Sequence, residues 1–552
     1  MMTFKTINIK SLAILFLIGC MPSCSFLDLD PVREYERKDF YATADQAMMG
    51  LVGVYGNLRP LYRRNLSVNL SLGTDEIVLN KASDNTLGAL IARHTFNRYT
   101  PEVNDIWTDS YRGISFANDF IYNMEGRGEI DGLSELQRKT YLGEGLALRA
   151  LFYFNLVRLY EHVPLRLEPF TDYALTPEQL HMPNSPAAKV YDQIIDDLDA
   201  AIALLPESPR NHGAVGKLAA HGLLARVYLT LAGARLQGGN VGEMKCYEMA
   251  VFHCNQVISS GKHELLPSYR TVFLNQIQQR NIDKEILWDV VFKVEDIRNM
   301  GGMLGQWLGP KIPNVSPSLP AADSRGSVTP WLIDLFDAEL DSRFDWNIAA
   351  YNISYDDEFK TYKYNNIGDQ NNFAIGKWRR AGLDLEMPDE DHVVFYEEGF
   401  LDRNSTSFDY PLVRYSDVLL MKAEALNQWK GINPEAIQAL DEVRFRAGLV
   451  SITEGLAERG LALSPATFLE EIKDERAREL CFEGHRRFDL VRWGEFTRRI
   501  QETYQYSQEV HGESRLHFIV PGENVLPKHE VFPIPEDEIN LNRNIEQHPD
   551  WQ

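Results

Sequence analysis

The densest group of ionisable side chains lies in residues 475–494, ERARELCFEGHRRFDLVRWG. The arginines and carboxylates in it are Arg476, Arg478, Arg486, Arg487, Arg492, Glu475, Glu479, Glu483 and Asp489. Such a group can act as acids and bases in an active site, bind phosphates, or hold a fold together through ion pairs. The spacing of the charges decides among these three.

The spacing favours structural ion pairs on a single helix. One stripe of that helix is largely charged and contains positions 472, 476, 479, 483, 486 and 490. The adjacent stripe is apolar and should face the core, with Ala477, Cys481, Gly484, Phe488 and Val491. Glu483 can then pair with Arg486 or Arg487, and Asp489 can pair with Arg492. We expect partly buried, paired charge, and unpaired reactive charge is the minor alternative.

Aromatic side chains outside helical patterns are better candidates for ligand binding. Sugar rings stack on exposed Trp or Tyr rings while nearby polar groups bond the hydroxyls. Trp307 lies in the Gly- and Pro-rich segment NMGGMLGQWLGPKIP, which has no helical stripe to bury it. A weaker second group in IARHTFNRYT consists of His94, Phe96, Arg98 and Tyr99. Trp107 shares helical spacing with Tyr111 and Ile114 and should be core.

Catalytic and metal-binding spacings are missing from the sequence. It has no G-x-S-x-G motif, GAVGKLA lacks two elements of a phosphate-binding loop, and HEVFP lacks the second His of a zinc-protease helix. The acidic turn at 389–391 lacks the Gly and the terminal Glu of a dedicated calcium loop, which favours a solvated loop. Paired carboxylates occur by chance among 79 acidic residues. We predict no catalytic residue, no metal site and no cofactor.

Paired helices are expected to position the candidate residues. Three pairs have apolar residues at helical spacing, and their segments are 141–164 with 185–206, 216–233 with 244–261, and 414–427 with 433–448. Ser185 is a plausible N-cap before Pro186 at the first helical position. Asn433 should cap the last helix and Gly448 should end it. Such pairs are typical of tetratricopeptide-like hairpins, here with a variable repeat length.

The segment from about 262 to 410 is different in character. Gly, Pro and Asn become frequent, and helical periodicity fades apart from TPWLIDLFDAEL. Long loops in a compact domain are usually functional or disordered. Residues 346–378 carry many aromatic side chains that suit short strands and loops. The predicted fold class is therefore mainly α, a scaffold of tetratricopeptide-like helical hairpins with long irregular loops and a few short strands.

Charge and the N-terminal segment indicate the compartment. The net charge of −23 argues against nucleic acid as a partner, because an acidic surface repels phosphates. Lys5 and Lys10 flank SLAILFLIG, which is too short to span a bilayer but suits a secretory signal peptide. Cys20 and Cys24 follow, and a cysteine at this place is typical of a lipoprotein signal, in which it is acylated. Cys20 fits the general pattern slightly better, and a plain secreted protein is the less favoured alternative.

The remaining cysteines predict no disulfide. Cys246 and Cys254 are expected on one helix, eight positions and roughly 12 Å apart. A disulfide tolerates only about 7 Å between the Cα atoms. Cys481 would then have no partner, and the spacing of the three does not suit zinc.

Three segments near the C-terminus carry a family resemblance. YPLVRYSDVLLMKAEALN, IKDERARELCFEGHRRFDLVRWG and HEVFPIPEDEINLNRNIEQHPDW strongly resemble, in that order, the hallmark segments of the RagB/SusD family of outer-membrane nutrient-binding lipoproteins. LALRALFYFNLVRLYEHVPL, VYDQIIDDLDAAIALLP and GKLAAHGLLARVYL resemble its tetratricopeptide-like helices, and CSFLDLDP resembles its mature N-terminus. Family members commonly place the acylated cysteine shortly before a Leu-Asp pair. The resemblance therefore favours Cys24 as the lipidated residue, with Cys20 as the alternative.

The resemblance implies a non-catalytic lipoprotein on the surface of the outer membrane, typically in Bacteroidota. It would capture an oligosaccharide or related nutrient and deliver it to a SusC-like TonB-dependent transporter. Ligand contacts in this family lie in variable loops, so no site residue is carried over by motif. The alternatives are a secreted glycan-cleaving enzyme and a peptide-binding helical adaptor. The expected organisation is a signal peptide (1–23), an N-terminal helical region (24–261), a loop-rich ligand-binding region (262–410) and a C-terminal region (411–552).

Overall fold

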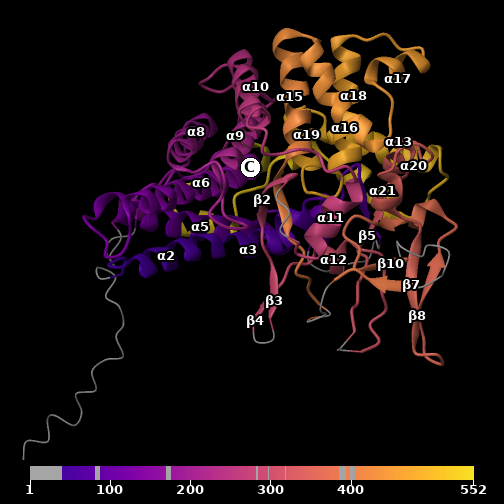
Figure 1. The fold of residues 1–552 in the computed structure, drawn as a ribbon, viewed down its shortest axis with the longest axis horizontal. Helices are drawn as coiled ribbons and strands as arrows, with labels where there is room; N and C mark the ends of the chain where they lie inside the picture. Colours follow the sequence, from indigo (N-terminus) through magenta and orange to yellow (C-terminus); the bar gives the residue numbers. More distant parts are fainter. Residues whose placement is uncertain are drawn as a thin grey trace, which may run out of the picture.

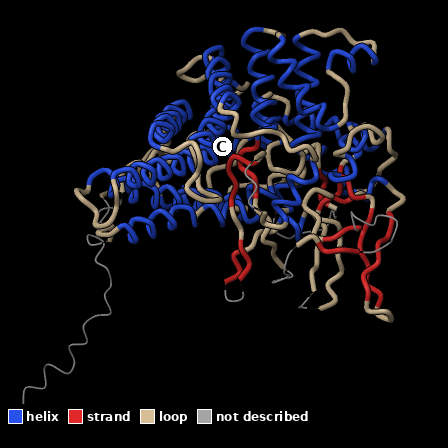
Figure 2. The backbone as a smooth tube through the Cα atoms, viewed as in Figure 1, coloured by secondary structure: helices blue, strands red, loops and turns tan. Residues whose placement is uncertain are grey.

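Helices form most of the molecule, and the strands gather on one side of it (Figures 1 and 2). The computed structural model describes residues 40–80, 88–169, 176–280, 284–295, 298–316, 319–383, 393–397, 402 and 404–552. This arrangement confirms the mainly α prediction. None of the helices in these ranges has the length and apolar character that a membrane span requires.

The N-terminal helices pack as sequential neighbours. α6 packs against α5 and α8, and α9 packs against α8 and α10, so both predicted N-terminal pairs are present. These elements are α2 (Ala44–Gly56), α3 (Leu58–Pro60), the π-helix η1 (Leu61–Asn69), α4 (Ala89–Ala92), α5 (Pro101–Gly126), α6 (Glu135–Tyr160), α7 (Pro177–Leu180), α8 (Ala187–Leu204), α9 (Lys217–Ala232), α10 (Glu243–Ser259) and α11 (Tyr269–Ile277). Trp107 is 3% exposed within this part, which confirms it as core.

The C-terminal helices join this array through α15, which packs against α10, α16 and α18. The third predicted pair, α15 with α16, is therefore also present. The remaining helices are α12 (Leu304–Trp307), α13 (Pro330–Leu335), α14 (Phe344–Asn347), η2 (Gln370–Asn372), α15 (Tyr415–Lys430), α16 (Pro434–Ala447), α17 (Ile452–Glu458), α18 (Pro465–Leu480), α19 (Arg486–Arg492), α20 (Phe496–Glu509), α21 (Leu516–Asn524), η3 (Pro527–Glu530), α22 (Glu536–Leu541) and η4 (Pro549–Trp551).

Cap residues set the ends of several helices. Asn433 Oδ1 accepts a hydrogen bond from the backbone N–H three residues later at 3.0 Å, and α16 ends where Gly448 takes φ +92°, both as predicted. The predicted start of α8 was one residue early. The helix begins at Ala187 with Pro186 as its cap, because Ser185 belongs to an isolated antiparallel bridge.

Short strands make one four-stranded sheet of order β1-β5-β9-β6 and several two-stranded ribbons. The strands are β1 (Ile77–Leu79), β2 (Ile286–Val290), β3 (Lys293–Glu295), β4 (Arg298–Met300), β5 (Gly326–Val328), β6 (Ile348–Ala349), β7 (Tyr351–Asp356), β8 (Thr361–Asn366), β9 (Ala374–Ile375), β10 (Ala381–Leu383), β11 (Val393–Phe395) and β12 (Tyr410–Arg414). Leu79 of β1 lies opposite Gly326 of β5. On the β7–β8 ribbon, Tyr351 stacks on Tyr364 with ring centres 4.4 Å apart. These aromatic strands agree with the prediction for residues 346–378.

The prediction of one helix through the charge-dense stretch is wrong. α18 ends at Leu480 and α19 begins at Arg486. Between them Phe482 and Gly484 have φ of +65° and +77°, which a right-handed helix does not allow. Gly484 is also required by space, since a Cβ there would lie 2.5 Å from Tyr410 Oη. The chain therefore turns sharply where the sequence suggests a continuous helix.

This turn sends the charged side chains into the interior. Glu483 was predicted to pair with Arg486 or Arg487, but it binds Lys377 and Arg414 at 2.8 and 2.7 Å. The predicted core stripe is correspondingly incomplete beyond the turn, where two of its side chains are only half-buried: Phe488 and Val491. Arg486 and Arg487 are here more buried than Phe488 and Val491.

The ion pairs join parts of the chain that are distant in sequence. Arg486 binds Asp75, just before β1, at 2.6 Å. The pair Asp489 with Arg492 forms within α19 at 2.9 Å, as predicted. Asp489 also binds Arg476 of α18 at 2.8 Å, so the same carboxylate ties the two helices together. The interpretation as paired structural charge is confirmed for most of the stretch, although most of the partners differ. Arg487 instead donates to the His529 carbonyl.

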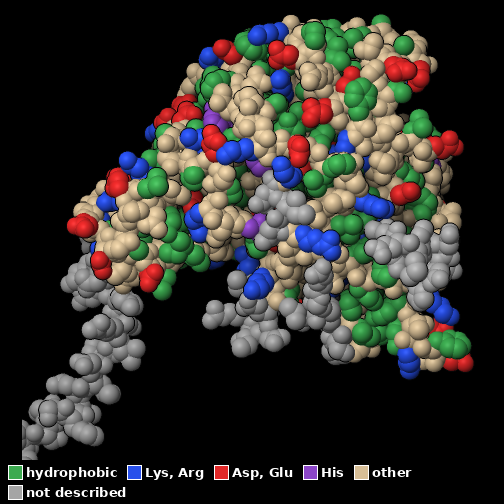
Figure 3. Space-filling model, in the orientation of Figure 1, with side chains coloured by type: hydrophobic (Ala, Val, Ile, Leu, Met, Phe, Trp, Pro, Cys, Tyr) green, Lys and Arg blue, Asp and Glu red, His purple; other side chains and the backbone are tan. Residues whose placement is uncertain are grey.

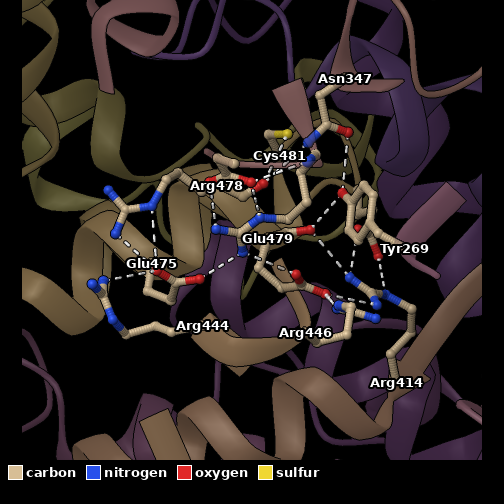
Figure 4. Close-up of polar contacts among 12 residues, drawn as sticks. Tyr269, Asn347, Arg414, Arg444, Arg446, Glu475, Arg478, Glu479 and Cys481 are labelled. Atoms are coloured by element: carbon tan, nitrogen blue, oxygen red, sulfur yellow. Dashed lines mark hydrogen bonds and ion pairs between the residues drawn. The ribbon is translucent and has the colours of Figure 1, made fainter. Parts of the chain in front are cut away.

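Glu479 lies at the centre of this network (Figure 4). Its carboxylate binds Arg343 and Arg414, each at 3.1 Å, and Arg446 at 2.5 Å. Burial alone would raise the pKa of Glu479, but the three guanidinium groups hold that pKa well below its usual range. The Tyr269 hydroxyl donates a hydrogen bond to the backbone carbonyl of Glu479 at 2.9 Å. The ordered charges therefore fasten α18 to the strand region.

Candidate functional site

Trp307 ends the single turn of α12, beside the start of β5. Asp323 N donates to Gln306 O, and Arg325 N donates to Trp307 O, both at 2.8 Å. On the other side, Asn80 N donates to Arg325 O at 3.0 Å and extends the β1–β5 pairing by one bond. These backbone bonds fix α12 to the end of the four-stranded sheet.

The side chains at this junction suit a polar ligand with apolar faces. The Arg325 guanidinium lies 4.2 Å from the Trp307 ring centre, a cation–π contact. Asn80 donates its side-chain N–H to the carbonyl of Ser324, whose φ of +51° is uncommon for a residue other than glycine. Such backbone conformations cluster at binding sites. We call Asn80, Gln306, Trp307, Ser324 and Arg325 the α12 corner.

Gln306 provides the clearest unused polar group of the α12 corner. Its side chain is 6% exposed, and its Oε1 atom has no hydrogen-bond partner among the residues that the structure describes. Buried polar atoms are normally paired, so an unpaired one needs an explanation. A hydroxyl of a bound ligand would supply the missing donor.

Trp307 is more buried than its sequence context suggests. It is 9% exposed and belongs to the main hydrophobic core. The expectation of an exposed loop residue is therefore wrong, because the ring packs in the core and Arg325 lies over it. A ligand at this place would meet only the small exposed part of the residue, and whether one binds there stays a prediction.

The second predicted group separates into core and surface residues. His94 and Phe96 are each 2% exposed. Phe96 packs on the rings of Phe532 and Trp551, with centres 4.8 and 5.5 Å away. His94 donates its Nε2–H to the Gly73 carbonyl at 2.9 Å. These contacts pack the segment that follows α4 against the C-terminal residues of the chain. The rings of His94 and Phe96 therefore have almost no exposed surface that a ligand could contact.

Arg98 and Tyr99 do reach the surface. Tyr99 is 65% exposed, and Arg98 donates to its hydroxyl at 3.2 Å. Arg98 also pairs with Glu536, at the start of α22, at 2.9 Å. Arg98 contacts α22, whereas Trp307 contacts Arg325, just before β5. Among the described residues, no ion pair or ring contact joins the two predicted groups into one site.

One donor cluster had no signal in the sequence. His212 Nε2 lies 3.0 Å from Asp409 Oδ2 and 3.4 Å from Asp289 Oδ2. The three ligand atoms lie within 4.8 Å of one another, and pairing of β2 with β12 brings the aspartates together. Burial raises the pKa of Asp409. Nitrogen and oxygen donors of this kind suit a divalent metal, and the prediction of no metal site stays untested.

Two further predictions fall outside the described residues. These are the candidate lipidation residues, Cys20 and Cys24, and the acidic turn at 389–391. Cys246, Cys254 and Cys481 are described, and all three are buried and free of disulfides.

Comparison with known proteins decides the family. A SusD family model matches residues 284–551, and a SusD-like model described as starch-binding and associating with the outer membrane matches residues 25–229. The chain belongs to the SusD family. The two matched segments cover both ends of the fold, which confirms the RagB/SusD resemblance.

Individual SusD-family proteins agree with this assignment. SusD-like protein P25 of Formosa agariphila is 27% identical over 96% of this chain and 95% of its own. A crystallised SusD homolog from Bacteroides thetaiotaomicron has a TM-score of 0.82 at 28% identity, covering 94% of this chain and 99% of its own. A laminarin-binding SusD-like protein has a TM-score of 0.68 at 25% identity, covering 92% and 100%. The predicted fold class is confirmed over nearly the whole chain.

Proposed function

We propose that this SusD-family protein binds a neutral oligosaccharide at the cell surface and passes it, uncleaved, to a SusC-like TonB-dependent transporter. A relative named for laminarin binding and a family model described as starch-binding support a glycan as the ligand. The observation in this chain that carries the proposal is the unpaired Oε1 of Gln306, the residue next to Trp307 in α12.

The α12 corner matches the two faces of a sugar ring. The exposed part of Trp307 offers an apolar contact for C–H groups. Gln306 Oε1 accepts a hydrogen bond from a hydroxyl, and the Arg325 guanidinium donates to sugar oxygens. The binding energy then depends on a small number of oriented polar bonds around an aromatic contact, as is usual for pockets of small ligands.

Gln306→Met tests the site without a loss of folding. The change removes the unpaired oxygen and keeps the volume, so we expect an unchanged or higher melting temperature. Affinity for the glycan should fall about tenfold, since a buried hydrogen bond to the ligand is lost. Calorimetric titration with laminarin and with soluble starch measures the affinity, and thermal denaturation measures the stability.

Gln276→Met is the matched control. Gln276 in α11 is 4% exposed and also has a buried Oε1 without a partner among the described residues. We expect this variant to bind as the wild type does. Equal losses in both variants would reject the α12 corner as the site, and release of reducing ends during incubation would favour the enzyme alternative.

A further inference from the structure

Two adjoining grooves lie on the helical side of the molecule, over α10, α15 and α16. Figure 1 shows these helices in the upper part of the view, whereas α12 is in the lower part. The first groove has a volume of about 630 Å³ and is lined by Phe252 and Trp429. The second has about 560 Å³ and is lined by Ile437 and Phe445. Pro434 lines both grooves, so they form one surface, which we call the α15–α16 groove.

Aromatic rings are exposed along this groove. Phe252 is 49% exposed and Phe445 is 58% exposed, while Trp429 is partly buried against the core. Ring surface in contact with water is unfavourable, and a ligand with apolar faces would cover it. The three rings come from three different helices, α10, α15 and α16, and together they line one surface.

Polar side chains of the groove are available to a ligand. Asn255 lines the first groove, and Gln438 and Glu442 line the second. Among the described residues, none of these three side chains has a hydrogen-bond partner. Amides and carboxylates next to aromatic rings provide both donors and acceptors for hydroxyl groups.

The charges of the groove disfavour an anionic ligand, because its lining contains one ammonium, Lys430, and four carboxylates: Glu248, Glu435, Asp441 and Glu442. Glu248 pairs with Lys245 at 2.9 Å and Glu435 pairs with Lys422 at 3.5 Å, so part of the acidic charge is neutralised within the protein. A stable protein partner would need about 800 Å² of complementary surface on each side. Here the apolar contacts are separate rings divided by polar groups, which suits a narrow polyhydroxylated chain better.

From this arrangement we infer that the α15–α16 groove is a second binding site for a neutral oligosaccharide, separate from the α12 corner. The inference rests on the proposed function, because it assumes a glycan ligand. The Lys430 ammonium lies 3.8 Å from the Trp429 ring centre and covers one face of it. Because Lys430 is exposed, a sugar can replace this amine on the ring. Two sites on one chain would let the protein hold a long glycan at two points and gain avidity.

Affinity electrophoresis of the full chain in native gels that contain laminarin or starch tests the inference. We expect Trp429→Ala and Phe252→Ala each to weaken retardation about three- to tenfold in apparent affinity, as loss of an aromatic contact predicts. Combining Trp429→Ala with Gln306→Met should abolish retardation. Lys430→Ala should retain or increase it, because the amine no longer competes for the ring.

Phe116→Ala is the matched control, since this ring on α5 is 47% exposed and lies outside the groove. Its mobility should equal that of the wild type. If the gel retards the wild type, Trp429→Ala and Phe252→Ala equally, the second site is rejected. The α12 corner then still stands as the binding site. That outcome would instead favour a protein partner for the groove. If neither gel retards the wild type, the proposed function and the second site both fail.

Discussion

Glu479 illustrates how this protein uses charge at the scale of single residues. Three arginines from three different segments converge on its carboxylate, and none of the four side chains is more than 4% exposed. A buried charge without a partner is far more costly than a buried pair. These four charged side chains therefore favour one arrangement of the segments that carry them. Such ion pairing explains why residues 475–494 are densely charged although they contain no catalytic motif.

Replacing this carboxylate tests the structural role. Glu479→Gln removes the negative charge that compensates Arg343, Arg414 and Arg446, so the free energy of unfolding should fall by about 3 to 5 kcal/mol. The matched control on the same helix is Glu470→Gln, whose side chain is 52% exposed and should change stability by less than about 0.5 kcal/mol. Urea unfolding followed by circular dichroism measures both. Equal effects would show that the network is no more important than a surface pair.

Helix pairs are the elements that the sequence predicted best. Apolar spacing marked α6 with α8, α9 with α10, and α15 with α16, because each helix must bury one face against its neighbour. The break between α18 and α19 was not predicted, since its left-handed Phe482 is stabilised by contacts from elsewhere in the chain. Its backbone N–H, for example, donates to Glu76 at 3.1 Å.

A histidine pair between α9 and α10 makes this hairpin sensitive to acid. His221 Nδ1 lies 2.8 Å from His253 Nδ1, so one ring donates to the other, which must be neutral. Burial lowers the pKa of His221 to about 4 and that of His253 to about 3, from an ordinary 6.5. The unfolded chain therefore binds more protons below pH 6.5. The stability that the neutral histidine pair gives the folded protein is fully present above pH 6.5 and is lost as the pH falls toward 4.

The double variant His221→Leu/His253→Leu should lose less stability on acidification than the wild type. Between pH 7.5 and pH 5 each histidine contributes at most about 2 kcal/mol to the wild-type loss. Unfolding free energies at the two pH values measure the difference, and the other ionisable groups are common to both proteins. Identical losses in the two proteins would show that the pair does not titrate with folding.

At the scale of the whole molecule, lysine, arginine and acidic side chains are intermixed on the face drawn in Figure 3. A mixed surface on a chain of net charge −23 suits an exported glycan-binding protein better than a nucleic-acid-binding one. Attachment to the outer membrane would keep such a protein close to a transporter. The anchor itself is a prediction from the N-terminal sequence.

Cys24→Ala should abolish acylation of the full chain. The cysteine thiol is the acceptor of the lipid, so its removal should release the protein from the membrane fraction. Metabolic labelling with palmitate and detergent partitioning measure the modification. Cys20→Ala is the matched control and should remain labelled, whereas labelling of Cys24→Ala but not of Cys20→Ala would assign the anchor to Cys20.

The sequence by itself determined the helical pairs, the buried Trp107, the family and the position of one candidate ring, Trp307. These depend on local spacing and motif order, which short segments carry on their own. Only the tertiary structure decided that Arg325 lies over the Trp307 ring, that Phe96 belongs to the core, and that Glu483 pairs with distant cations. The physical reason is that burial and ion pairing depend on which segments meet in space. The α12 corner forms only when β1, α12 and β5 come together.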